Sequence, residues 1–327
     1  MRKRAVLLLA AAIHVLLMLV CALLWPLKGW LLRPFRGRER HHFWPCPLHT
    51  DPPPTSRMEL KTPDGRQLFF PTMTVCSLGH LRVNLVPLFL PEADVRAMLP
   101  HFLRLGKQPV APPGQHPVLM FLGHQHRVRP MPVRVSGMDY LEYILAVPFV
   151  RLTATDSRYR GPFAYMPRLF LDSSFPVFLG KLCGYAKERS LVRSTETTYD
   201  VRTVAGRAQV LSGTFRPLGD GFEPLPDSDS GNALRMLLEQ PIIGNQLLGL
   251  TIATYLDFYL PWAKVQPADA ELIINTPFLP GIVPGTHKVA GLTAGKLGAC
   301  RLASHWRLYP PLDVHDMWSE PANRSWA

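Results

Sequence analysis

The chain has 327 residues, of which 47% are hydrophobic, and its 34 prolines and 23 glycines are spread along its length. This composition excludes a disordered chain and favours a globular domain rich in strands and turns. The net charge of +12 comes without zinc-finger spacing, an RNP-like aromatic motif or a basic helix, so no nucleic-acid partner is predicted. The five cysteines are scattered without a CxxC pair, which excludes a disulfide framework and a zinc knuckle.

An apolar segment opens the chain. Residues 5–25 contain His14 as their only polar side chain, and at about 1.5 Å per residue such a helix reaches roughly 31 Å, enough to cross a bilayer. Trp25 and Trp30 would then lie at the membrane interface. We therefore expect a transmembrane anchor with basic flanks at residues 1–30; a cleaved signal peptide is the alternative.

The basic residues around this segment bear on localisation. Three precede it and five follow it, which leans toward a single-pass membrane protein whose C-terminal domain is cytoplasmic. An anionic membrane surface is accordingly the simplest partner for the basic charge. These residues are Arg2, Lys3, Arg4, Lys28, Arg33, Arg36, Arg38 and Arg40.

Composition divides the rest of the chain into three parts. Residues 31–66 are rich in Pro and His and read as a tether. Residues 67–312 form the predicted globular domain, and residues 313–327 form a C-terminal tail.

The globular domain reads as mainly strands with a few short helices. Alternating polar and apolar residues or β-branched and aromatic runs indicate strands, and Pro with acidic residues in a first turn indicates a helix. This pattern predicts an α+β fold, mainly β, built as a β-barrel with short helices. The expected strands are 74–90, 118–122, 138–152, 162–182, 199–204, 207–215, 247–259, 270–275 and 295–308, with a loop at 216–231 and helices at 91–99 and 232–238.

Gly184-Tyr185-Ala186-Lys187 ends an apolar run and carries the candidate chemistry. With a pKa near 10.4, only about one lysine in 2,500 is neutral at pH 7. Burial or a neighbouring cation lowers that pKa and makes the amine a nucleophile toward ketones. Lys187 is either such an amine or a solvated strand end. Glu142, in an otherwise apolar strand, is either its proton shuttle or an ion-pair partner.

An ordered set of motifs resembles the acetoacetate decarboxylase-like superfamily. The motifs lie between residues 140 and 216 and follow the order and spacing of that family. They are Tyr140-Leu-Glu142-Tyr, Gly161-Pro-Phe-Ala-Tyr165, Leu169-Phe-Leu-Asp172, Gly180-Lys181, Gly184-Tyr-Ala-Lys187 and the 200–215 hairpin.

The resemblance implies a cone-shaped antiparallel β-barrel with a Schiff-base lysine and no cofactor. Lys187 falls on the family's lysine and Glu142 on one catalytic glutamate. Tyr165 and Tyr185 lie in the matching motifs and are expected to contact substrate. Arg129 is a candidate for binding a substrate carboxylate. The expected activity is lyase chemistry on a keto or β-keto acid.

The chain departs from the family pattern next to the lysine. Glu188 stands where the family has a second lysine. If Glu188 faces Lys187 it raises the lysine pKa, and if it lies on the opposite face of the strand it matters less. The family's substrate-binding arginine falls near Gly79-His80, where this chain has none.

Two further interpretations stay open. A non-catalytic barrel could bind a hydrophobic ligand at the membrane, with Lys187 and Glu142 as a structural pair. His124 and His126 share a strand face and resemble a metal pair, but no third ligand is evident in the sequence, so no metal site is predicted. The oligomeric state is open, a homo-oligomer included.

Overall fold

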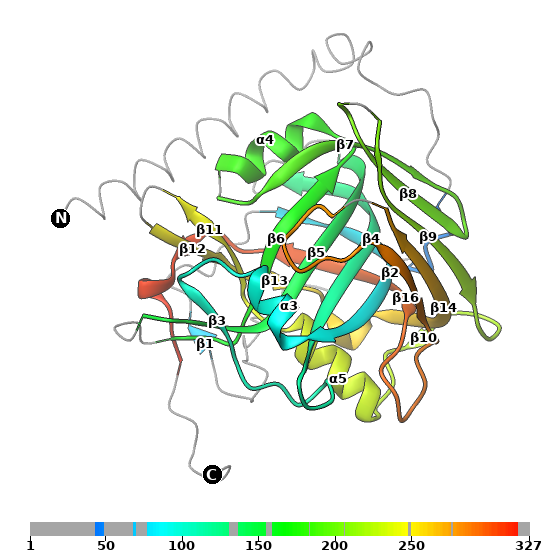
Figure 1. The fold of residues 1–327 in the computed structure, drawn as a ribbon. Coiled ribbons are helices and arrows are strands. Elements are labelled where there is room, and N and C mark those ends of the chain that lie inside the picture. Colours follow the sequence, from blue (N-terminus) through cyan, green and yellow to red (C-terminus); the bar gives the residue numbers. More distant parts are fainter. Residues whose placement is uncertain are drawn as a thin grey trace.

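The computed structural model describes residues 43–48, 68–69, 77–130, 137–154, 159–182, 184–205, 207–247, 250–275 and 277–319 (Figure 1). The fold is mainly β, as expected. Its strands are β1 Leu68–Phe69, β2 Ser77–Pro91, β3 Leu103–Leu105, β4 Gln115–Pro130, β5 Met138–Leu152, β6 Phe163–Leu171, β7 Lys187–Ser194, β8 Thr198–Thr203, β9 Gln209–Pro217, β10 Glu223–Pro224, β11 Ile242–Leu247, β12 Leu250–Thr254, β13 Leu256–Asp257, β14 Lys264–Ile274, β15 Gly285–Val289, β16 Cys300–Leu308, β17 Leu312–Asp313 and β18 Trp318–Ser319. Its helices are α3 Glu92–Ala97, α4 Ser174–Leu182 and α5 Asp229–Leu238, with the 3-10 turns η2 Leu260–Trp262 and η3 Val314–Asp316.

Long neighbouring strands form the centre of the molecule (Figure 1). β16, β2, β4, β5 and β6 follow one another as antiparallel neighbours. From β6 the pairing continues through β7, β8, β9 and β14 back to β16, so these strands form a closed cycle of hydrogen-bonded neighbours. We call this cycle the strand ring.

The central strands separate two hydrophobic cores. On β5, Leu141, Tyr143 and Leu145 belong to a first core, which residues of β8, β9 and β14 complete. Tyr140 and Ile144 face the other way into a second core, to which α5 and β16 contribute. Because successive strand residues point to opposite faces, side chains from Tyr140 to Val147 of β5 point alternately toward the two cores.

The stretch 162–182 differs from the expectation of a strand. β6 ends at Leu171, and α4 begins at Ser174 with Pro176 in its first turn, a position that tolerates proline. The helix carries the chain back across the sheet, so β7 pairs with β6 in parallel. β6 is also parallel to β11. The sheet is therefore mixed, and the expectation of purely antiparallel strands is corrected.

Other expected elements are confirmed. The strand at 138–152 is β5, and the helix at 91–99 is α3. β8 and β9 form the expected hairpin. The helix at 232–238 begins earlier, at Asp229, because the Ser228 hydroxyl caps it by accepting a hydrogen bond from the Gly231 N–H. The 216–231 loop accordingly ends sooner and contains β10.

The expected membrane segment at residues 5–25 lies outside the described residues. Within the part of the chain that is described, no helix has the length and apolar character needed to cross a membrane. The expectation of a single-pass membrane localisation is corrected on this finding. In the expected tether, Phe43–Leu48 is described, and Trp44 is buried there against Phe222.

Candidate active site

Glu142 lies on β5 and is 3% exposed. Its neighbours in the strand alternate between the cores, which places its side chain on the face of Tyr140 and Ile144, toward the second core. The Gln125 side-chain amide on β4 donates a hydrogen bond to the Glu142 carboxylate. Trp306 Nε1 on β16 in turn donates to Gln125 Oε1 at 2.7 Å. A chain of hydrogen bonds that runs from β16 through β4 to β5 therefore fixes the carboxyl group.

The environment of Glu142 shifts its acidity in two directions. Burial raises the pKa of Glu142 above its ordinary value, and the carboxylate of Asp172 raises it further. The positive charge of Lys187 and the hydrogen bond from Gln125 lower it. The net direction is upward, so Glu142 holds its proton to a higher pH than an exposed glutamate.

Lys187 is the first residue of β7 and is partly buried. Its register partner on the parallel strand β6 is Leu169, a residue of the second core. Adjacent strands place register partners on the same face, so Lys187 points to the side of the sheet that also carries Glu142. A Cβ at position 180 of α4 would overlap with Cδ and Cε of Lys187, so the glycine leaves room for the lysine side chain where it lies. The helix thus covers the aliphatic part of the lysine.

Glu188 lies on the opposite face of β7. Its register partner is Phe170, which belongs to the first core. The Glu188 carboxylate accepts a hydrogen bond from Arg168 Nη1 at 2.8 Å in an ion pair. Of the two alternatives left by the sequence, the structure therefore supports the second, in which the acid faces away from Lys187.

Lys187 and Glu142 are brought together across β6. Ile144 pairs with Leu169, which pairs with Lys187, while Glu142 pairs with Leu171 one step along the same face. The two functional side chains thus lie diagonally, with one strand between them. At this separation the positive charge of Lys187 lowers the pKa of Glu142, against the larger upward effect of burial.

The two expected substrate tyrosines are placed differently. The Tyr185 ring packs against the second core, and its carbonyl accepts the Lys187 N–H at 2.8 Å. Tyr165 packs in the first core, where its hydroxyl donates to Asn245 Oδ1 at 2.9 Å. Burial raises the pKa of Tyr165 to about 12, although the Arg168 charge opposes the shift. Of the two, Tyr185 is the one beside Lys187.

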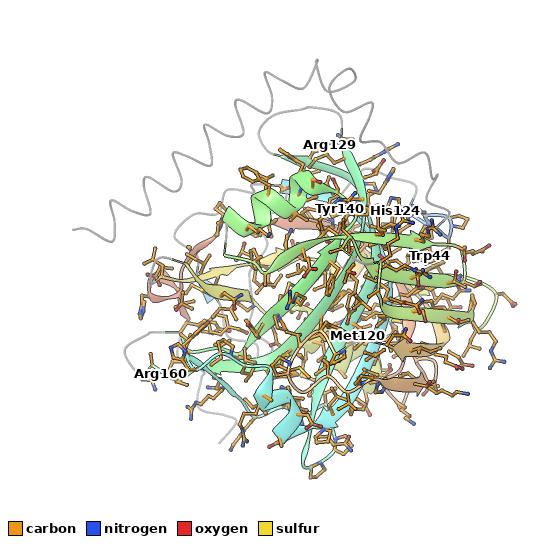
Figure 2. The ribbon with its side chains drawn as sticks, turned by 45° about the horizontal axis from the view of Figure 1, so that its top comes forward. Trp44, Met120, His124, Arg129, Tyr140 and Arg160 are labelled. Atoms are coloured by element: carbon orange, nitrogen blue, oxygen red, sulfur yellow. The ribbon has the colours of Figure 1, made fainter. Side chains whose placement is uncertain are left out.

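Arg129 lies near the end of β4 (Figure 2). Arg129 is six positions after Gly123, the register partner of Glu142. Six positions span about 20 Å along a strand. The structure does not bring Arg129 next to the Lys187–Glu142 pair.

Sequence reasoning gave no role to four polar or aromatic residues around Glu142, although Tyr140 and Asp172 lie in the quoted motifs. Gln125 and Trp306 form the hydrogen-bond chain, and Asp172 Oδ1 accepts the Leu141 N–H at 3.0 Å. Tyr140 is fully buried beside them, and burial raises its pKa well above 10. A polar side chain inside an apolar strand could have indicated such residues. Gln125 did not stand out in this way, because it lies between two other polar residues, His124 and His126.

The position of the family's arginine is filled by another side chain. At Gly79 a Cβ would lie 2.9 Å from Cζ2 of Trp306, so the indole occupies the space that a larger residue would need. Trp306 belongs to the second core. The face carrying Lys187 and Glu142 is therefore closed here by an aromatic ring.

Comparison with known proteins gives distant structural similarity only. No family model and no curated protein matches the chain. It is similar to the solved enduracididine biosynthesis enzyme MppR complexed with pyruvate, with 13% identity over 75% of this chain and 93% of that chain and a TM-score of 0.48. It is also similar to acetoacetate decarboxylase from Legionella pneumophila, with 14% identity, coverage of 77% and 94%, and a TM-score of 0.45.

A third similar structure is an acetoacetate decarboxylase-like enzyme from Sphingomonas wittichii RW1, with 10% identity, coverage of 74% and 94%, and a TM-score of 0.46. Acetoacetate decarboxylase-like proteins are thus among the structural neighbours, the superfamily that the sequence resembles.

Proposed function

We propose that the chain is a Schiff-base lysine enzyme acting on a keto or β-keto acid, with Lys187 as the amine and Glu142 as the proton carrier. The observation that supports this most is the placement of both side chains on one apolar face, across a single strand. In such surroundings a neutral amine beside a protonated acid costs less than two separate charges. The pair can therefore supply the uncharged nucleophile.

The proposed chemistry balances with these two groups and water. The Lys187 amine adds to the substrate carbonyl carbon, and loss of water from the carbinolamine gives a protonated imine. With a β-keto acid, the bond between the α-carbon and the carboxylate carbon then breaks, CO2 leaves, and the bonding pair moves toward the imine nitrogen to form an enamine. Glu142 protonates the enamine carbon and takes up a replacement proton from water. Hydrolysis of the resulting imine releases the ketone and restores the amine.

Burial suits Glu142 to this role. A general acid works best when its pKa lies near the working pH, and burial moves the pKa of Glu142 upward from its ordinary value. The Gln125 amide orients the carboxyl group without supplying a charge. We assign to Tyr185 the positioning of substrate at Lys187, because its carbonyl accepts the Lys187 N–H and its ring packs against the second core, toward which Lys187 also points.

Borohydride trapping tests this proposal. Acetoacetate or pyruvate is added with sodium borohydride, which reduces an imine to a stable secondary amine, and the intact protein is weighed by mass spectrometry. We expect a mass gain that is lost in Lys187→Arg and kept in Lys181→Arg, an exposed lysine of α4. No gain with either acid, or the same gain in Lys187→Arg, would rule out the lysine chemistry.

A non-catalytic role in binding a hydrophobic ligand is the second candidate. It is favoured by an apolar pocket away from Lys187, lined mainly by Leu88, Leu90, Ile274, Ile282 and Val283, with Asp94 and His287 at its wall. A fluorescent fatty acid would then bind equally well to wild type and to Lys187→Met. Loss of probe binding in Val283→Arg, which changes an exposed residue that lines the pocket, would show that the probe binds in this pocket and not at the lysine face.

A further inference from the structure

A row of histidines crosses the strands on the face opposite to Lys187 and Glu142. His305 on β16 pairs with His80 on β2, which pairs with His126 on β4. The ring centroid of His80 lies 4.4 Å from that of His305 and 5.9 Å from that of His126. His124, two residues before His126 on β4, has its ring centroid 5.8 Å from that of His126. Imidazoles from three strands therefore gather in one place.

A bulge adds a carboxylate to this row. Gln125 pairs with Tyr140 and Val128 with Met138, so two residues of β4 face the single residue Asp139 of β5. Asp139 Oδ1 lies 2.8 Å from His126 Nδ1 and accepts the Arg127 N–H at 2.8 Å. The third ligand that the sequence did not reveal thus comes from the neighbouring strand.

The bulge is held in a costly backbone conformation. Arg127 has a φ of 51°, which is unfavourable for a residue other than glycine, asparagine or aspartate. Position 137 must be glycine, because a Cβ there would overlap with the Arg127 backbone. Strain of this kind is concentrated at functional sites, and here it aims His126 and Asp139 at one another.

We propose that His124, His126 and Asp139 bind a divalent transition-metal ion of the zinc type. Their ligand atoms all lie within 4.8 Å of one another. Two ligand atoms that each lie about 2.0–2.1 Å from one tetrahedral zinc are about 3.4 Å apart. Side-chain rotations that move the ligand atoms by roughly 1 Å would therefore close the site around the ion. Two imidazoles and one carboxylate suit zinc, cobalt or nickel and are a poor match for magnesium or calcium.

Arg82 competes with the ion. Its Nη2 contacts His124 Nδ1, and its Nη1 donates to the Trp44 carbonyl. A guanidinium in contact with His124 repels a cation bound there and occupies the lone pair of the imidazole nitrogen. Metal binding therefore requires Arg82 to turn away from His124, and the ion and the arginine exclude one another at this ring.

Calorimetric titration of the full chain tests the site. The protein, prepared without a histidine tag and freed of metal with EDTA, is titrated with Zn²⁺ and then with Co²⁺. We expect saturable binding of one ion per chain and weakening by at least about tenfold in Asp139→Asn and in His124→Gln/His126→Gln. His315→Gln, a change of an exposed histidine, keeps wild-type affinity.

Arg82→Met separates the proposed competition from a general change in the fold. It removes the charge but keeps an aliphatic side chain, so Zn²⁺ affinity increases if Arg82 opposes the ion. Near-ultraviolet circular dichroism checks that each variant is folded. Absence of saturable Zn²⁺ binding by wild type, or equal affinity in His124→Gln/His126→Gln, overturns the proposal. Equal or weaker affinity in Arg82→Met overturns the role given to that arginine.

Discussion

Lys187 and Gly180 are in contact, and the contact depends on the missing side chain of the glycine. The lysine of β7 runs beneath α4 where Gly180 leaves its aliphatic carbons room. Glu142 lies on the same face of the sheet, one strand away. The helix is therefore part of the wall that shields the lysine from water.

Gly180→Ala should displace Lys187. The added methyl would overlap with the lysine side chain, whereas alanine in a helix is by itself favourable by about 1 kcal/mol. We expect loss of most imine trapping without a matching loss of stability in urea. Gly221→Ala, where nothing lies within 4 Å of a new Cβ, is the control. Normal trapping in Gly180→Ala would show that the helix does not position the lysine.

Glu142→Gln should reduce turnover with little effect on folding. Glutamine keeps the acceptor for Gln125 but cannot carry the proton, and loss of a general acid or base costs about 10² to 10⁴ in rate. Steady-state kinetics of decarboxylation measures the effect. Glu188→Gln, on the opposite face and paired with Arg168, should retain activity. Equal losses in both variants would argue against a specific role for Glu142.

Trp306→Phe should destabilise the protein through the Glu142 hydrogen-bond chain. It removes the Nε1 donor to Gln125 Oε1, which is 2.7 Å away in the core, and a buried acceptor without its partner costs about 1–3 kcal/mol. Urea unfolding gives the change in free energy of unfolding. Trp262→Phe, at a position that is 63% exposed, should be nearly neutral, and a comparable loss there would contradict this account.

Asp257 should make stability fall as the pH rises through mildly acidic values. Burial raises the pKa of Asp257 to about 6, and the Arg307 charge opposes this. The folded state therefore holds the proton more tightly than the unfolded state, whose aspartate has a pKa of about 3.9. The resulting stability is complete below pH ~4 and is lost as the pH rises through about 6, by up to roughly 3 kcal/mol.

Urea unfolding between pH 4 and pH 7 measures this loss as the difference between wild type and Asp257→Asn. The Asn variant cannot ionise but still offers an oxygen to the Tyr259 N–H, which Oδ1 of Asp257 accepts at 2.9 Å. Asp220→Asn, an exposed position, serves as the control. Parallel pH curves for wild type and Asp257→Asn would mean that this carboxyl titrates normally.

The sequence predicts β5 to the residue because the stretch is rich in β-branched and aromatic residues, and Glu142 stands out in it as an acid within an apolar run. It does not predict α4, because residues 162–182 are mostly apolar and aromatic, and periodicity alone cannot separate a buried strand from a buried helix. That error matters for the site, since α4 supplies Gly180 and makes β7 parallel to β6.

Partners across strands were beyond prediction. Gln125, Trp306 and Asp139 act through cross-strand register and one bulge, which depend on how distant segments pair. A single sequence states which residues share a strand face and leaves the neighbouring strand unnamed. For Glu188 the sequence did name both possible orientations, toward Lys187 or toward the opposite face of β7. The register between β7 and β6 supports the second.

The location of the reduced adduct tests the central claim most directly. After borohydride treatment with acetoacetate or pyruvate, the protein is digested and its peptides are sequenced by mass spectrometry. The account predicts modification at Lys187 and an unmodified Lys181, which lies six positions earlier in the chain. Modification spread over exposed lysines such as Lys181 and Lys288, or none at Lys187, would contradict it.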